Sequence, residues 1–209
     1  MKYDSGIFFK IALICGILLN SCGEKPDKTT EQTQIQQHRH EKDHYFSTNK
    51  NSPFTEKQQS QFSGLSYYPV DLEYRVQAKL QRYDAKDTIA IQTTTNRKQY
   101  YYLWGEFQFQ IHDRPETLVV YKPLEISDNH TPYFFVPFYD PTNGESTYGG
   151  GRYLDIPIRN SDIYTLDFNL AYNPYCAYDH SRWSCPIPPL ENRLDIPVKA
   201  GEKVYPHAK

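Results

Sequence analysis

The sequence has no excess of basic residues, no second long apolar run and no nucleotide-binding motif. Lys and Arg number 23 against 25 Asp and Glu, which gives a formal net charge of −2. A nucleic-acid-binding domain needs a basic face, so this balance argues against a nucleic-acid partner. No stretch beyond the N-terminal one approaches the roughly 18 apolar residues of a transmembrane helix. Neither a metal-ligand spacing nor a Ser-His-Asp order is present, so we predict no cofactor and no metal site.

The N-terminus has the pattern of a bacterial lipoprotein signal. Lys2 and Lys10 supply basic charge, and residues 11–19 form an almost purely apolar run that is too short to span a bilayer. Residues 19–22, Leu-Asn-Ser-Cys, resemble a lipobox; the alternative is a short buried helix that contains a cysteine. We expect residues 1–21 to be a signal peptide. Lipid on Cys22 would then anchor the chain in the bacterial cell envelope, with the outer membrane favoured.

Few cysteines remain once this signal is set aside. Of the four in the chain, Cys15 leaves with the signal peptide and Cys22 carries the lipid. Cys176 and Cys185 remain, and in an oxidising envelope such a closely spaced pair is typical of a disulfide. Two other interpretations stay open: a metal or reactive-thiol site that includes His180, and two unpaired structural cysteines.

Composition divides the mature chain into a polar segment and one domain. Residues 22–44 have almost nothing apolar to bury, so we expect a flexible tether. Residues 45–209 are predicted to form a single β-rich domain that is long enough for its own core. A short helix is expected near Ser52, because Pro53 suits a first helical turn and Glu56 follows it.

Alternation of apolar and polar residues dominates the first half of this domain. It predicts half-exposed strands over residues 70–83, 88–94, 101–111 and 117–122, and Gly105 indicates a bulge in the third. Strands with one wet face favour antiparallel pairing. No long helical period or internal repeat is present. We therefore predict a mainly β fold, either an antiparallel sandwich or a partly open barrel, with a short N-terminal helix.

The second half of the domain departs from this pattern. Residues 134–138 predict a buried strand in which Pro137 indicates an edge or a bulge. Residues 147–153 contain three consecutive glycines, which favour a tight hairpin with a bulge. The alternative is a turn whose N–H groups, together with Arg152, hold an anion. Residues 194–198 predict a last strand.

A strand predicted over residues 166–173 carries the polar groups most suggestive of a site. Asp167, Asn169 and Asn173 share one face of it, with alternate residues about 6.7 Å apart. If that face is buried, these groups need partners, and Arg152 is the expected partner of Asp167. The face is interpreted as the floor of a polar pocket, or else as a solvent face or a structural hydrogen-bond network.

Several motifs stand out as a set: residues 138–144, 147–153, 167–169, 173–178 and 185–192. Together they resemble the bacterial and archaeal domain-of-unknown-function family 1684, over roughly residues 40–204. The family has no established activity, so the resemblance brings little function with it. It implies that the following residues occupy signature positions: Asp140, Thr142, Arg152, Asp167, Asn169, Asn173, Cys176, Cys185, Glu191 and Asn192.

Three functions compete at this stage. The first is a lipoprotein that binds a small molecule or glycan without catalysis, through a polar pocket built from Asp140, Thr142, Tyr148, Arg152, Asp167, Asn169, Asn173, Glu191 and Asn192. The second is a hydrolase-type enzyme in which Asp167 or Glu191 is the general base and Arg152 stabilises negative charge. The third is a structural or interaction protein with no ligand. If Arg152, Asp167 and Glu191 converge in an open cleft, the first two functions are favoured. If the same groups are satisfied inside a closed hydrogen-bond network, the third is favoured.

Overall fold

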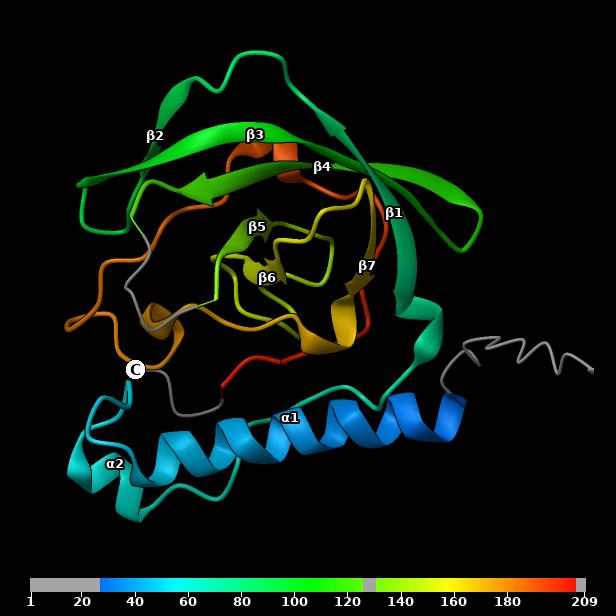
Figure 1. Cartoon of the computed structure of the whole chain (residues 1–209). Coiled ribbons are helices and arrows are strands. Elements are labelled where there is room, and N and C mark those ends of the chain that lie inside the picture. Colours follow the sequence, from blue (N-terminus) through cyan, green and yellow to red (C-terminus); the bar gives the residue numbers. More distant parts are fainter. Residues whose placement is uncertain (1–26, 126–130, 206–209) are drawn as a thin grey trace, which may run out of the picture.

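The fold is a single antiparallel sheet that curls into an open half-barrel, with a long helix packed alongside it (Figure 1). The computed structural model describes residues 27–125 and 131–205. The strands are β1 (Arg75–Arg82), β2 (Thr88–Gln92), β3 (Lys98–Ile111), β4 (Arg114–Pro123), β5 (Tyr133–Phe138), β6 (Arg152–Pro157) and β7 (Ile163–Asp167). Their order is β6-β5-β4-β3-β1-β7, and β2 pairs with β3. The mainly β prediction is confirmed, with the partly open barrel as the form adopted.

Short helical segments connect these strands. Besides the two α-helices described below, they are the 3-10 turns η1 (Leu72–Tyr74), η2 (Phe168–Leu170), η3 (Tyr175–Ala177) and η4 (Leu190–Asn192).

The main core fills the hollow of the curled sheet. Its fully buried side chains include alternate, inward-facing members of four strands: Phe107, Leu118, Phe134 and Leu166. The bulge predicted at Gly105 is present, since the β3–β4 register shifts between Leu103 and Gly105. A side chain at Gly105 would collide with the carbonyl oxygen of Gln81 on β1. Close approach of the two strands therefore explains the glycine.

The strand predicted over residues 166–173 ends early. β7 stops at Asp167, whose side chain accepts a hydrogen bond from the Asn169 N–H at 3.0 Å and so starts η2. Such local side-chain bonds compete with strand pairing. The prediction of one continuous strand was wrong beyond Asp167, and Asn173 does not share a strand face with it. Residues 194–198 bury alternate side chains as predicted, but they form no sheet strand.

The polar segment predicted as a flexible tether is largely helical. Helix α1 (Lys28–Thr48) covers most of it, and its side chains Ile35 and Phe46 are 3% and 2% exposed. Phe46 packs edge-on against Phe54 and Tyr178, with ring centroids 5.4 and 5.2 Å away. Two apolar anchors are enough to dock a helix whose remaining surface is polar, and composition alone could not reveal them.

Charged side chains complete the docking of α1. Arg39 donates to the carbonyl oxygens of Tyr68 and Asn169 at 2.8 and 3.1 Å. Lys42 lies 2.5 Å from Glu202, which is 1% exposed. Within the described residues no helix is both long and apolar enough to cross a bilayer. The predicted signal peptide and Cys22 lie outside those residues.

The short helix expected near Ser52 begins a few residues later. Helix α2 (Glu56–Ser60) starts after Thr55, which shares a capping box with Gln58. The Thr55 side chain accepts from the Gln58 N–H, and the Gln58 side chain accepts from the Thr55 N–H. This reciprocal cap fixes the start of the helix and explains the shift.

Candidate functional site

Arg152 is the centre of a closed network rather than of an open pocket. Its side chain at the start of β6 is fully buried, and Nη2 donates to Asp140 Oδ1 at 3.0 Å and to the Val198 carbonyl at 2.9 Å. Nη1 donates to the carbonyl of Ala200. The predicted pairing of Arg152 with Asp167 was wrong. The C-terminal segment supplies the carbonyls that make a buried guanidinium tolerable, and Asp140 supplies the charge.

Asp140 is equally enclosed. Its Oδ2 atom accepts from the Thr142 hydroxyl at 2.8 Å and from the Val198 N–H at 2.8 Å. Thr142 in turn hydrogen-bonds the hydroxyl of Thr147 at 2.8 Å. Asp140 and Thr142 are 1% and 4% exposed, so neither presents an oxygen to a ligand.

The signature asparagines satisfy backbone groups of distant segments. Asn169 accepts from the Asp71 N–H at 2.9 Å and donates to the Asp71 carbonyl at 2.7 Å. Asn173 donates from Nδ2 to the Lys203 carbonyl at 2.9 Å, and its own N–H goes to Glu202. Both side chains are buried. They clip loops onto the sheet, as unpaired buried backbone groups require.

Asn192 performs the same task beside Pro137. Its Nδ2 donates to the carbonyls of Pro137 and Val119 at 2.7 and 2.9 Å, and its Oδ1 accepts from the Val119 N–H. β5 lies between β4 and β6 and is not an edge strand of the sheet, but at Pro137 it has no β4 partner. Pairing of β5 with β4 is confined to Tyr121 and Phe135, and Asn192 bonds the backbone where that pairing has ended.

The remaining predicted residues lie apart from one another. Glu191 is exposed and accepts from the Tyr121 hydroxyl at 3.2 Å, while the half-buried Tyr148 ring lies 6.0 Å from the ring of His180. No contact joins any two of Arg152, Asp167 and Glu191 within the part of the chain that the structure describes. The three groups required by the hydrolase hypothesis are therefore not assembled.

The glycine-rich turn is packed rather than open. Gly151 has φ +84°, and a Cβ there would lie 2.7 Å from both the Phe138 carbonyl oxygen and the Pro188 ring. Its N–H donates to the Tyr148 carbonyl at 3.2 Å. This geometry is that of a tight turn between β5 and β6, and the packing leaves no room for an anion at Gly151.

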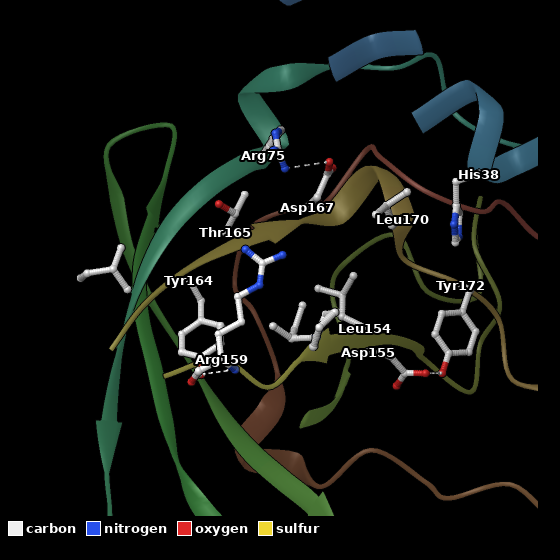
Figure 2. Close-up of a pocket in the computed structure, with 13 residues that line it drawn as sticks. His38, Arg75, Leu154, Asp155, Arg159, Tyr164, Thr165, Asp167, Leu170 and Tyr172 are labelled. Carbon is white, nitrogen blue, oxygen red and sulfur yellow. Dashed lines mark hydrogen bonds and ion pairs between the residues drawn. The ribbon is translucent and has the colours of Figure 1, made fainter. Parts of the chain in front are cut away.

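A cavity of about 340 Å³ lies elsewhere, between β6 and β7 and beneath α1 (Figure 2). Among the predicted ligand-binding residues, Asp167 alone lines it. Apolar lining comes from Leu154, Ile156 and Leu170. Polar side chains surround this apolar floor: His38, Arg75, Asp155, Arg159, Thr165 and Tyr172. An apolar cavity with a few converging polar groups is the usual form of a small-molecule site.

Strand alternation delivers the β6 residues to this cavity. Leu154 and Ile156 face the core, whereas Asp155, Pro157 and Arg159 face outward and are exposed. The extended conformation continues past the end of β6, because the Ile158 N–H donates to the Pro132 carbonyl at 2.9 Å. Asp155 and Arg159 therefore stand on one face of the same extended segment.

Asp155 occupies one end of the cavity. Its Oδ2 accepts from the Tyr172 hydroxyl at 2.8 Å (Figure 2). Desolvation by the surrounding protein raises the pKa of Asp155 to about 6, against the opposing effects of the Tyr172 hydrogen bond and of Lys42. His38 stands above Tyr172 on α1, and burial together with Lys42 lowers its pKa. A carboxylate that titrates this close to neutrality is typical of functional sites.

The charged groups of the opposite wall are paired with one another. Arg75 lies 3.4 Å from Asp167 and 3.2 Å from Glu31. Desolvation raises the pKa of Asp167, opposed by its hydrogen bonds from Asn169. Arg159 differs, since within residues 27–125 and 131–205 its guanidinium has no ion pair and no hydrogen bond. It extends over the cavity toward Thr165 in Figure 2.

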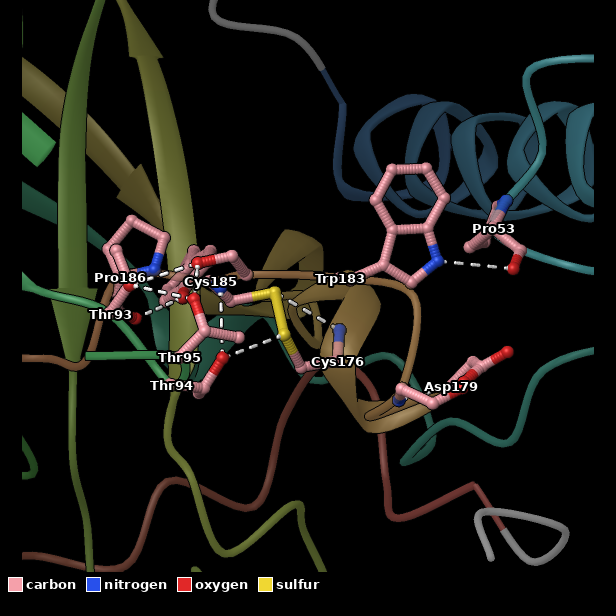
Figure 3. The surroundings of a disulfide bond; sticks show 12 residues. Pro53, Thr93, Thr94, Thr95, Cys176, Asp179, Trp183, Cys185 and Pro186 are labelled. Carbon is pink, nitrogen blue, oxygen red and sulfur yellow. Dashed lines mark hydrogen bonds between the residues drawn. A yellow bond between two sulfur atoms is a disulfide. The ribbon is translucent and has the colours of Figure 1, made fainter. Parts of the chain in front are cut away.

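The disulfide predicted from the cysteine count is present (Figure 3). Cys176 and Cys185 are bonded, with Cα atoms 6.1 Å apart. This excludes the unpaired, metal-binding and reactive-thiol interpretations for the state described. The bond ties η3 to the proline-rich segment, whose Cys185 carbonyl also accepts from the Thr94 N–H at 3.0 Å. Neither cysteine lines the cavity between β6 and β7.

Sequence reasoning missed Asp155, Arg159, Thr165 and Tyr172 as cavity residues. A signal for two of them was available, because residues 152–159 alternate between apolar and polar or proline positions. Reading that stretch as a strand places Asp155 and Arg159 together on its outer face. The contribution of β7 depends on how the sheet curls, which local patterns do not encode.

A solved structure similar to this chain shares its fold and is that of an uncharacterised protein. The solution structure of an uncharacterised protein from Haloarcula marismortui, gene locus rrnAC0354, is 35% identical and has a TM-score of 0.66. The match covers 85% of this chain and 97% of that one. No curated protein matches the chain. The family described as protein of unknown function (DUF1684) matches residues 60–203, and the chain therefore belongs to it.

Proposed function

We propose that this protein is a lipid-anchored component of the bacterial cell envelope that binds a small polar molecule in the cavity between β6 and β7. The anchoring part rests on the N-terminal basic and apolar pattern and on the lipobox that ends at Cys22. The binding part rests on one observation. The cavity presents the unpartnered guanidinium of Arg159 and the carboxylate of Asp155 above an apolar floor.

The site differs from the one predicted around the glycine-rich turn. Apart from Asp167, which lines the cavity, the buried signature residues are bonded to one another and to backbone groups, and they do not line it. Arg152 fixes the start of β6, and Asn169 fixes the turn that follows β7. Both strands that line the cavity are thus held by signature side chains, which keeps its walls in place.

Binding is tested on the full-length protein in mild detergent, by thermal shift with amino acids, simple carboxylic acids and sugars. A ligand at a hundredfold its dissociation constant stabilises the folded state by about 2.7 kcal/mol. We expect a hit that is lost in Arg159→Gln and retained in Arg114→Gln. Arg114 is an exposed arginine outside the cavity and serves as the matched control. A hit that survives Arg159→Gln would place binding elsewhere.

Anchoring is tested separately in cells that are fed a labelled fatty acid. We expect the label and membrane association in the wild type, and loss of both in Cys22→Ser. Label retained in Cys22→Ser would contradict a lipid on that cysteine.

A second candidate function is that of a structural protein without a ligand. The closed network around Arg152 and Asp140 favours it, since such residues can be retained for folding alone. The same binding panel separates the two candidates, because a ligand-free protein gives no shift with any probe.

A further inference from the structure

The cavity lies at the seam where the half-barrel fails to close, and the inference below rests on the proposed binding function. β6 and β7 stand at the two ends of the strand order, so each has one edge without a strand partner (Figure 1). Edge strands expose backbone N–H and C=O groups that seek partners. The backbone groups at the seam that have no hydrogen-bond partner are available to a ligand in the cavity.

Most outward backbone groups on the β6 segment are already bonded. Tyr153 exchanges two hydrogen bonds with the backbone of Tyr172, at 2.9 and 3.0 Å. The Arg159 N–H and carbonyl are both bonded to the Tyr164 hydroxyl, at 3.2 and 2.8 Å. Alternation places the Asp155 backbone on this same outward edge. It has no partner there among the described residues, and Pro157 has no N–H to offer.

The edge of β7 repeats this arrangement. The Leu80 N–H donates to the Asp162 carbonyl at 2.7 Å, so the backbone groups of Asp162 face β1. Because these groups alternate in direction along a strand, those of Thr165 face away from β1 and toward the seam. Both backbone groups of Ile163 are bonded to the Ser161 hydroxyl, at 2.9 and 3.0 Å. Side chains thus close the ends of the seam. Asp155 and Thr165 retain open backbone groups where the cavity lies.

The charges of the cavity are arranged along β6. Arg159 lies four residue steps along the extended chain from Asp155, which places their Cα atoms about 13 Å apart. The Arg159 side chain extends over the cavity toward Thr165 (Figure 2). On the facing wall Arg75 already pairs with both Asp167 and Glu31. Among the Asp and Arg side chains of the cavity that the structure describes, Asp155 and Arg159 therefore remain without an ion pair, and the apolar Leu154 lies between them in Figure 2.

We propose that the cavity binds a small zwitterion, namely an amino acid with a compact apolar side chain. Its carboxylate pairs with the Arg159 guanidinium and its ammonium group with the Asp155 carboxylate. The apolar side chain lies on Leu154 and Leu170, and the open backbone groups of Thr165 complete the contacts. A carboxylic acid without an amine leaves Asp155 facing its negative charge, and a neutral sugar leaves both charges without a counterion.

The test measures binding of four probes to the full-length protein by calorimetry at pH 7.5. The probes are leucine, leucinamide (which lacks the carboxylate), 4-methylpentanoate (which lacks the amine) and glucose. Leucine is expected to bind roughly tenfold or more tightly than the other three, because charge-assisted hydrogen bonds are the strong ones. Valine and alanine are run beside leucine to allow for the size of the cavity.

Two variants assign the ends of the ligand. Arg159→Gln is expected to abolish the preference for leucine over leucinamide, and Asp155→Asn the preference for leucine over 4-methylpentanoate. Arg114→Gln should leave every affinity unchanged. Both target side chains are exposed, so the variants should fold.

Failure of this inference is distinguishable from failure of the proposed function. If glucose or 4-methylpentanoate binds most tightly and Arg159→Gln weakens it, the cavity is a binding site but its ligand is not a zwitterion. If none of the six probes binds, both proposals are overturned and the structural candidate stands.

Discussion

Arg152 donates from Nη2 to Asp140 Oδ1 across 3.0 Å, and neither side chain has any solvent-exposed surface. The pair joins the start of β6 to the turn after β5, and the carbonyls of Val198 and Ala200 also accept hydrogen bonds from the guanidinium. Three segments far apart in the sequence therefore depend on one charge pair.

Replacing Arg152 with methionine should destabilise the fold severely. The change leaves Asp140 buried without its counterion, and breaking a buried pair in this way costs about 3–5 kcal/mol. The free energy of unfolding in urea measures the effect. Arg159→Gln serves as the control and should stay within about 0.5 kcal/mol of the wild type, because its side chain is exposed and makes no contact to lose. A cost below about 1 kcal/mol for Arg152→Met would contradict the closed network.

Two glycines with the same backbone conformation should respond differently to alanine. Gly144 and Gly151 have φ +83° and +84°, so an alanine at either site costs about 1–2 kcal/mol for the left-handed backbone. A Cβ at Gly144 meets nothing within 4 Å, whereas at Gly151 it lies 2.7 Å from the Phe138 carbonyl oxygen. Gly151→Ala should therefore be clearly the more destabilising in urea unfolding. Equal costs would mean that the turn relaxes around the added methyl.

Local patterns predicted the strands of this protein but not the partners of its polar groups. The alternation that runs through β1 and β3 is a property of neighbouring residues, and so is the bulge at Gly105. The disulfide was predicted from the count of cysteines, on the expectation that the chain is exported. Each of these features depends on a few neighbouring residues or on the number of cysteines.

The site could not be predicted in the same way, because its geometry depends on the C-terminal segment and on the curl of the sheet. Arg152 is bonded to Asp140, and not to Asp167, since residues 198–200 pass over β6 and provide carbonyls at that point. Asp155 and Thr165 line the same cavity because β6 and β7 end the sheet on either side of one seam. Neither relationship leaves a periodic signal in the chain.

Helix α1 should contribute to stability, in contrast to the flexible tether that composition suggested. Phe46→Ala removes a 2% exposed ring from a cluster with Phe54 and Tyr178 and should cost about 3–5 kcal/mol. Gln36→Ala, an exposed change on the same helix, should have an effect within about 0.5 kcal/mol. The free energy of unfolding in urea, measured for both variants, tests this prediction. If Phe46→Ala leaves it unchanged, the segment acts as a tether and does not stabilise the fold.

Asp155 should make the stability of the protein fall as pH rises between about 4 and 6. Its pKa is raised to about 6 in the folded state, against an ordinary value near 3.9. Within that window the folded state holds a proton that the unfolded state has released, so the free energy of unfolding decreases with pH. Asp155→Asn lacks this titration, and its stability relative to the wild type should rise across the window.

Other carboxylates with raised pKa values, such as Asp167, are present in both proteins, so the difference between the two unfolding curves isolates Asp155. Tyr172→Phe is the companion variant. It removes the hydroxyl that donates to the carboxylate and lowers its pKa, so it should shift the titration of Asp155 upward. Carbon-detected NMR of the Asp155 carboxyl follows that titration directly. A midpoint near 4 in the wild type would show that solvent screens this group, and a midpoint that moves down in Tyr172→Phe would contradict the pKa-lowering effect of the Tyr172 hydrogen bond.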